Sequence, residues 1–264
     1  MKIHKLTVSV IASALLLAGC SQRASDVNDT VKLALFGTPD VVKTAQEVRA
    51  LPYASTYARI GDYNQIFMVL ALAEHKYLQT NTNTNTNTNT NTNTNTNTNT
   101  NTNTNTNTNT NTNTNTHDNP LQLKWMSSDN GMLVTENGRI VKTFGLQDGN
   151  LLASNSTTPD PLWLNLTQKN TPTEWQRTIS WQPGFHVGYQ LTSNFTNLGP
   201  EIIDINGQPT NSVKFDESVT VKELNQTYHN TFWLNPTSGQ VIKSIQYPAP
   251  GLPEIEMTLL KPFA

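Results

Sequence analysis

Residues 132–143 read Met-Leu-Val-Thr-Glu-Asn-Gly-Arg-Ile-Val-Lys-Thr and hold the clearest structural signal in the chain. Two β-prone segments flank Asn137-Gly138, the preferred pair for a type I′ turn because both positions need a positive φ. That turn fixes a register that pairs Glu136 with Arg139, Thr135 with Ile140 and Val134 with Val141. We therefore interpret Glu136 and Arg139 as a cross-strand ion pair worth at most about 1 kcal/mol, and not as catalytic groups.

Similar short β-prone segments follow the hairpin as far as the C-terminus. Alternation is plainest where Val213, Phe215, Val219 and Val221 are separated by polar residues, which predicts one buried and one wet face. Turn residues such as Asn206-Gly207 separate the segments. The predicted strands are 175–181, 188–195, 201–205, 213–223, 228–234, 240–247 and 255–260. We expect a mainly β fold of antiparallel meander sheets, arranged as a curved sheet, a sandwich or a half-barrel.

The segments that precede the hairpin contain both helix and strand signals. Residues 53–60 and 65–72 read as two strands across a tight turn at Gly61-Asp62, and residues 121–126 read as another strand. One or two short N-terminal helices are expected, the first over 26–35 and the second shortly after Asp40. Glycines and prolines interrupt residues 145–172, where we expect a loop-rich crossing that divides two lobes.

A Thr-Asn repeat of 37 residues occupies positions 80–116. Neither face of such a strand is apolar and nothing fixes its register, so we expect a disordered loop. Lengthening a loop from about four residues to this size costs only ~2 kcal/mol of closure entropy. A tolerated expansion in a surface loop is the simplest origin; a surface brush or a spacer is the functional alternative. Uncharged Asn-rich tracts also carry a risk of self-association.

The N-terminus has the pattern of an export signal. Lys2 and Lys5 precede an apolar run of about twelve residues, which as a helix spans only ~18 Å of a ~30 Å hydrocarbon core. The run ends in Leu-Ala-Gly-Cys, which resembles the bacterial lipobox. That resemblance implies cleavage before Cys20, the single cysteine, and a lipid on its sulfur; Ser21 then points to the outer membrane. A plain signal peptide with an incidental cysteine is the alternative.

Composition bounds the mature chain. Residues 1–19 are predicted to be the signal peptide and 20–264 a single domain interrupted by the repeat, with about 208 residues outside the repeat and the signal. Without Lys2 and Lys5, 15 of the 17 basic residues remain against 19 acidic ones, a formal charge of −4. This balance argues against nucleic acid as a partner.

The sequence holds no constellation that predicts catalysis or a metal site. Gly-x-Ser-x-Gly, His-Glu-x-x-His and phosphate-loop patterns are absent, and the histidines lie far apart. Adjacent acids such as Asp216 and Glu217 would point to opposite faces of a strand. We expect no enzyme, no cofactor and no metal.

Aromatic side chains are the candidate contacts for a ligand or a protein partner. Trp233, Trp181 and Trp175 offer flat apolar faces suited to sugar rings, although most tryptophans in β domains pack in the core. Trp233 is out of phase with Phe232, so one of the two is expected to be exposed.

Several stretches together resemble the YjbF/GfcB family of outer-membrane lipoproteins. They are Leu-Pro-Tyr-Ala-Ser at 51–55, the 132–143 hairpin, Asn-Thr-Phe-Trp at 230–233 with Gly-Gln-Val at 239–241, and Met-Thr-Leu-Leu-Lys-Pro at 257–262. The resemblance covers nearly the whole chain, apart from the repeat. It implies a place in group 4 capsule and exopolysaccharide operons, beside an outer-membrane β-barrel and periplasmic proteins, without enzymatic activity.

Three functions remain open from the sequence. The first is a lipid-anchored accessory protein on the periplasmic side of the outer membrane that helps assemble or export an exopolysaccharide through contacts with a partner or the glycan. The second is a lipid or lipoprotein carrier, which an unfilled apolar cavity inside the sheet would favour. The third is a glycan-modifying enzyme, which convergent carboxylates in a cleft would favour.

Overall fold

The computed structural model describes residues 39–75, 79–94, 98–113 and 120–263. The predicted signal peptide, Cys20 and the predicted helix over 26–35 lie outside these residues. Within them the chain is mainly antiparallel β, as predicted. One helix is described after Asp40, α3 (Ala45–Ala50), which begins in a capping box: Glu47 N donates to Thr44 Oγ1, and Thr44 N donates to the Glu47 carboxylate.

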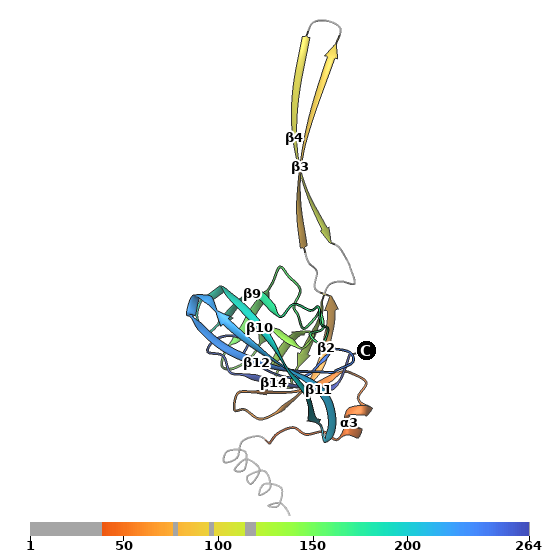
Figure 1. The fold of residues 1–264 in the computed structure, drawn as a ribbon, viewed down its shortest axis with the longest axis vertical. Helices are drawn as coiled ribbons and strands as arrows, with labels where there is room; N and C mark the ends of the chain where they lie inside the picture. Colours follow the sequence, from red (N-terminus) through yellow and green to blue (C-terminus); the bar gives the residue numbers. More distant parts are fainter. Residues whose placement is uncertain (1–38, 76–78, 95–97, 114–119, 264) are drawn as a thin grey trace, which may run out of the picture.

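In the part of the chain that the structure describes, twelve strands form one sheet (Figure 1). Their spatial order is β7-β6-β5-β2-β1-β14-β13-β12-β11-β10-β9-β8, and every neighbouring pair is antiparallel. Their bounds are β1 (Ser55–Ile60), β2 (Ile66–His75), β5 (Leu121–Met126), β6 (Met132–Glu136), β7 (Arg139–Phe144), β8 (Asn150–Asn155), β9 (Glu174–Gln182), β10 (His186–Ile205), β11 (Gln208–Val221), β12 (Gln226–Leu234), β13 (Val241–Gln246) and β14 (Ile255–Lys261).

The connections between these strands alternate between two ends of the sheet because successive strands run in opposite directions. At one end, which we call the turn end, lie the connections after β1, β5, β7, β9, β11 and β13. At the other, the pocket end, lie the connections after β2, β6, β8, β10 and β12, with the start of β1 and the end of β14.

The sheet curves until its two outermost strands meet. Thr143 on β7 accepts a hydrogen bond from Leu151 N on β8 at 2.9 Å through its hydroxyl oxygen, which also lies 3.3 Å from Asn150 Oδ1. These side-chain contacts replace a backbone ladder between β7 and β8. The 145–172 segment therefore does not divide two lobes, and it contains a strand, β8, that the sequence did not predict.

The curvature encloses two apolar clusters. One lies towards the turn end and includes Trp181, Leu191, Val219 and Val221. The other lies towards the pocket end and includes Phe215, Phe232 and Leu234. The predicted alternation on β11 is confirmed, since Phe215, Val219 and Val221 are each at most 2% exposed.

The β6–β7 hairpin forms with the predicted turn, because Asn137 and Gly138 have φ values of 42° and 85°. Glu136 pairs with Arg139 and Thr135 with Ile140, as predicted. The prediction for Val134 was wrong: a bulge after it shifts its partner to Lys142. The predicted ion pair between Glu136 and Arg139 was wrong, since the Arg139 side chain is buried and pairs with Asp160 and Glu217 instead.

The predicted strands 188–195 and 201–205 are one strand, β10, with a register shift between Asn197 and Gly199. Gly199 takes a φ of +92° at this irregularity. Beyond it, Ile203 packs with Trp233 and Ile242 in a third cluster. Pro200 therefore does not end the strand.

The Thr-Asn repeat forms a separate two-stranded sheet of β3 (Gln79–Thr94) and β4 (Thr98–Asn113). Figure 1 shows it as a long ribbon extending away from the twelve-stranded sheet. The disorder expected from the sequence stays a prediction. Antiparallel pairing places Thr opposite Thr and Asn opposite Asn along the ribbon, so the backbone is hydrogen-bonded without an apolar face.

Candidate functional site

Arg139 lies at the centre of a buried charged cluster. Its Nη1 donates to Glu217 Oε2 on β11 at 2.9 Å. Its Nε also donates to Asp160, and Nη2 lies 3.3 Å from Asp160 Oδ1. The three side chains are at most 10% exposed. The arginine thus connects β7, β11 and the β8–β9 loop inside the sheet.

Glu217 accepts two further hydrogen bonds from neighbouring strands. Arg177 Nη1 on β9 lies 3.1 Å from Oε1, and Asn230 Nδ2 on β12 lies 2.8 Å from Oε2. Arg177 also donates to Ser193 Oγ on β10 at 2.6 Å. We call Arg139, Asp160, Arg177, Ser193, Glu217 and Asn230 the polar layer. On each of β9 to β12, the polar-layer residue points to the same side of the strand as the apolar residues two positions before and after it. The layer therefore lies between the two apolar clusters.

Trp175 packs against both arginines of the polar layer. Its ring centroid lies 4.7 Å from Arg139 Cζ and 4.8 Å from Arg177 Cζ, within cation–π range. Its Nε1 donates to Thr158 O at 3.2 Å. The indole is therefore a structural part of the cluster.

Electrostatics keep the polar layer ionised. Burial alone would raise the pKa of Glu217, but the charges of Arg139 and Arg177 outweigh burial and lower that pKa to about 2. Burial likewise opposes the charge of Arg139, yet Asp160 and Glu217 raise its pKa above the ordinary value. A carboxyl with such a low pKa is a poor proton donor at neutral pH, so Glu217 does not suit the role of general acid.

The polar layer also positions the loop that carries Trp163. Asp160 Oδ1 accepts from Leu162 N at 2.9 Å, and Asp160 O accepts from Trp163 N at 2.9 Å. Asn137, in the β6–β7 turn, donates its amide to Leu162 O. Charge pairing inside the sheet therefore fixes a half-buried indole at the pocket end.

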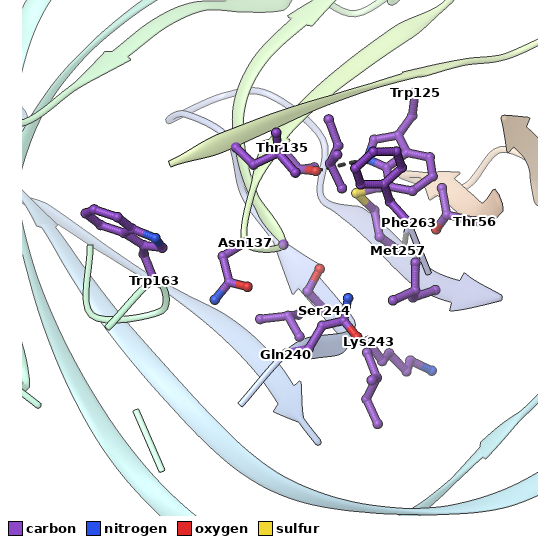
Figure 2. A pocket seen from close by; sticks show the side chains of 16 residues that line it. Thr56, Trp125, Thr135, Asn137, Trp163, Gln240, Lys243, Ser244, Met257 and Phe263 are labelled. Atoms are coloured by element: carbon purple, nitrogen blue, oxygen red, sulfur yellow. Dashed lines mark hydrogen bonds between the residues drawn. The ribbon is translucent and has the colours of Figure 1, made fainter. Parts of the chain in front are cut away.

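A cavity of about 220 Å³ opens at the pocket end, beside this indole (Figure 2). Figure 2 shows Trp163 on one side and Trp125, Met257 and Phe263 on the other, with Asn137 between them. Trp125 Nε1 donates to Thr135 Oγ1 at 2.9 Å, which satisfies the buried indole N–H. The volume of this cavity is below the roughly 300–1,000 Å³ of most small-molecule sites, so the cavity suits one side chain or one ring.

A larger cavity of about 620 Å³ lies at the turn end. Its apolar lining includes Ile60, Ile66 and Met68, and carboxylates of Asp62 and Asp148 also line it. This volume falls within the range of small-molecule sites.

The structure buries the three predicted contact tryptophans. Trp175, Trp181 and Trp233 are at most 7% exposed, as is Phe232, so the expected exposure of Trp233 or Phe232 was wrong. The reason is that both faces of β12 are covered: Phe232 packs inside the sheet, while the extension of β10 covers Trp233. Contact between a ligand and these indoles would require their neighbours to move.

The described histidines do not gather at a site. His186 stacks on Trp181 with ring centroids 4.2 Å apart, and His229 Nδ1 lies 2.9 Å from Asp216 Oδ2 on the outer face. His117 lies outside the described residues. No group of three or more His, Cys, Asp or Glu side chains in the described part of the chain could hold a metal ion. Nor does any helix within these residues have the length and apolar character to cross a bilayer.

Sequence reasoning did not identify the polar layer. A signal for Glu217 was present, because it falls in phase with the apolar residues Phe215 and Val219 on β11. Arg177 is similarly in phase with Trp175 and Ile179 on β9. Asp160 and Trp163 could not be placed in this way, because their loop has no regular period.

Comparison with known proteins identifies similar lipoproteins. A family model described as "Group 4 capsule polysaccharide lipoprotein gfcB, YjbF" matches residues 28–260. Lipoprotein GfcB of Escherichia coli (strain K12) is 31% identical over 250 residues, covering 94% of this chain and 95% of GfcB. Lipoprotein YjbF of the same strain is 27% identical over 254 residues, covering 96% of both chains. The crystal structure of the hypothetical lipoprotein YmcC from Escherichia coli (K12) superimposes with a TM-score of 0.60 and 30% identity, covering 89% of this chain and 96% of YmcC.

Proposed function

The chain belongs to the YjbF family of group 4 capsule polysaccharide lipoproteins, and we propose that it is an accessory protein in capsule or exopolysaccharide assembly or export that acts by binding. It is held by a lipid on Cys20 at the outer membrane, facing the periplasm. Its partners are an outer-membrane β-barrel, periplasmic proteins of the export system, and the polysaccharide itself.

The observation that carries this proposal is the cavity beside Trp163. It is held open by a rigid frame, since the loop bearing the indole is tied to the polar layer through Asp160 and to the hairpin through Asn137. Such a pocket accepts one aromatic or apolar anchor of a partner, as binding interfaces commonly require. The carboxylates Asp160 and Glu217 are occupied by Arg139, which supports binding over catalysis.

Genetic complementation tests the proposal. Deletion of the gene is expected to reduce surface polysaccharide, and Trp163→Ala is expected to restore it poorly although the protein reaches the membrane. Leu164→Ala is the matched control, because this exposed neighbour lies in the same loop but does not line the cavity. Detergent extracts of the outer membrane should yield a copurifying β-barrel protein. Unchanged polysaccharide after deletion, with no copurifying envelope protein, would refute the accessory role.

The anchor has its own test. Cys20→Ala is expected to abolish labelling by a radioactive fatty acid and to release the protein from membranes, because no other cysteine is present. Cys20→Ala protein that still takes up label and sediments with membranes would end the lipid-anchor proposal.

The carrier function is the second candidate, and the turn-end cavity favours it. Its volume of about 620 Å³ and its side chains Ile60, Ile66 and Met68 could enclose part of an acyl chain. Mass spectrometry of the protein under non-denaturing conditions would then show a non-covalent lipid besides the one on Cys20. Met68→Trp, which fills the cavity, should remove it. A protein that carries no such lipid is not a carrier.

A further inference from the structure

Phe185 lies at the tip of the β9–β10 hairpin, at the turn end, and exposes 102% of its reference area. The tip is fixed rather than loose, because the next residue, His186, stacks on Trp181 at 4.2 Å with an angle of 5° between the rings. Gly184, with a φ of +92°, precedes Phe185 in the turn. The hairpin therefore directs a phenyl ring into solvent on a supported base.

Other exposed apolar side chains share this end of the sheet. Val187 follows Phe185 and is 76% exposed, Val42 next to the β1–β2 turn is 74% exposed, and Tyr63 within that turn is 52% exposed. Phe185, Val187 and Val42 are the three most exposed large apolar side chains among the described residues, and all three lie at the turn end. Exposed apolar residues that gather on one face, unlike scattered ones, indicate an interaction surface.

The turns that carry these side chains are neighbours. A Cβ at Gly149, in the β7–β8 turn, would lie 2.6 Å from Pro183 Cδ in the β9–β10 turn. In the same β7–β8 turn, Asp148 is close enough to Tyr63 to raise the pKa of its phenol. The β1–β2, β7–β8 and β9–β10 turns therefore form one rim.

The chain arrives from Cys20 at this same rim. Asp40 Oδ1 accepts from Gln65 N at 2.7 Å, and Val41 N donates to Gln65 O at 3.0 Å, at the end of the β1–β2 turn. Residues 21–38 separate Cys20 from Pro39, and eighteen residues reach at most about 60 Å. A connection of this length permits many orientations of the body, so a preferred orientation needs a contact of its own.

We propose that the turn end is a bilayer-contact face, on which Phe185, Val187, Val42 and Tyr63 enter the interfacial region of the membrane that holds the lipid on Cys20. This inference rests on the proposed anchor and adds an orientation to it. Amphipathic and aromatic side chains favour the membrane interface, and burying one phenylalanine shifts a partition constant by about 10- to 100-fold.

The charged side chains at the turn end indicate which lipid headgroups this face can contact. Asp62 and Asp148 line the cavity at this rim, whereas Glu223 in the β11–β12 connection at the same end is accompanied by Lys222. Anionic headgroups would be repelled by these carboxylates. We therefore expect the turn end to contact the bilayer through apolar side chains and to bind zwitterionic lipid better than anionic lipid.

This orientation places the cavity beside Trp163 at the pocket end, on the side away from the membrane. The lipid and the apolar rim hold one end of the sheet, and the other end is left for periplasmic partners. The two ends of the same sheet thus serve different contacts.

Site-specific labelling of the lipidated full-length protein tests the bilayer contact. With the Cys20 sulfur occupied, Phe185→Cys introduces the only free thiol, and Thr237→Cys in the exposed β12–β13 turn is its counterpart at the pocket end. Each variant is labelled with an environment-sensitive fluorophore and reconstituted in phosphatidylcholine vesicles. The label at 185 is expected to shift to the blue and to be quenched several-fold more by lipids brominated on their acyl chains than the label at 237. Added phosphatidylglycerol should not strengthen the quenching.

The mass of the protein in the same samples shows whether Cys20 carries a lipid. This measurement distinguishes failure of the proposed anchor from failure of the proposed bilayer-contact face. A lipidated, vesicle-bound protein whose label at 185 stays in water overturns the bilayer-contact face and leaves the anchor standing. A label shielded in native envelopes but not in pure lipid vesicles means that a protein partner covers the rim, which also overturns it. A protein without a lipid on Cys20 overturns both.

Discussion

Arg139 Nη1 lies 2.9 Å from Glu217 Oε2, joining two residues that are 78 positions apart in the chain. Their strands, β7 and β11, are not neighbours in the sheet, so this pair bridges its interior. A buried ion pair need not stabilise a fold more than apolar residues would, but removal of one partner leaves an uncompensated charge. The pair therefore makes the fold sensitive to single substitutions at either residue.

Glu217→Gln is expected to lower the free energy of unfolding by about 3–5 kcal/mol, because Arg139 and Arg177 lose a shared counter-charge in a buried site. Asp216→Asn is the matched control: this neighbour faces the opposite side and contacts His229, whose side chain is 61% exposed. Its effect should stay within about 0.5 kcal/mol. Urea unfolding followed by tryptophan fluorescence measures both, and equal effects of the two variants would contradict the expectation.

Glu217 also predicts a dependence of stability on pH. The pKa of Glu217 is about 2 in the folded protein and about 4.3 in an unfolded chain, so folding favours the ionised form. Its contribution is present above the unfolded pKa and is lost as pH falls towards the folded pKa, between about pH 4.5 and 2. The gap in unfolding free energy between wild type and Glu217→Gln should therefore narrow from pH 5 to pH 3. A gap that stays constant over this interval would argue against the ion pair.

Two glycines in Asn-Gly turns provide a matched comparison at the pocket end. Gly138 and Gly207 have φ values of +85° and +77°, so Ala at either costs roughly 1–2 kcal/mol. At Gly138 the added Cβ would also lie 2.4 Å from Val241 Cβ, whereas nothing lies within 4 Å at Gly207. Overpacking should add about 1–3 kcal/mol at Gly138 alone.

Calorimetric melting of Gly138→Ala and Gly207→Ala measures this difference. Val241→Ala combined with Gly138→Ala should recover only the part of the loss that comes from Val241 Cγ1 and Cγ2, at 2.8 and 2.9 Å from the added Cβ, because alanine keeps the Cβ at 2.4 Å. Equal melting temperatures for the two single variants would mean that the Val241 side chain moves away from the added Cβ with no loss of stability.

Local chemistry in the sequence predicts much of the sheet. The Asn137-Gly138 turn and the alternation on β11 were both predictable, because turn geometry and period-2 burial depend on near neighbours in the chain. The bulge after Val134 was not, since no Gly or Pro marks it. The continuity of β10 through Pro200 was also missed, because its pairing with β11 outweighs a local strand-breaking signal.

The candidate site was less predictable than the fold. Trp175, Trp181 and Trp233 were chosen as contacts for their chemistry, but exposure depends on how the sheet curves and on what β10 covers. Trp163 lines the cavity because Arg139 binds Asp160 across the interior, a contact between a strand and an irregular loop. No spacing rule connects such residues. The position of the cavity beside Trp163 therefore depends on an ion pair between residues that are distant in the sequence.

Removal of the Thr-Asn repeat is expected to leave the twelve-stranded sheet intact. In its described residues, 80–94 and 98–113, the repeat pairs with itself, as β3 with β4, in a separate sheet. Replacing residues 80–116 by four residues of Gly and Ser shortens the loop, which lowers its closure cost by up to ~2 kcal/mol. The melting temperature should therefore stay the same or rise by no more than about 8 °C. A Gly-Ser segment of 37 residues is the control for length, because it keeps the loop size and removes the Thr-Asn pairing. A fall of more than a few degrees in the short variant, with no fall in the long one, would show that β2 and β5 need the full loop length.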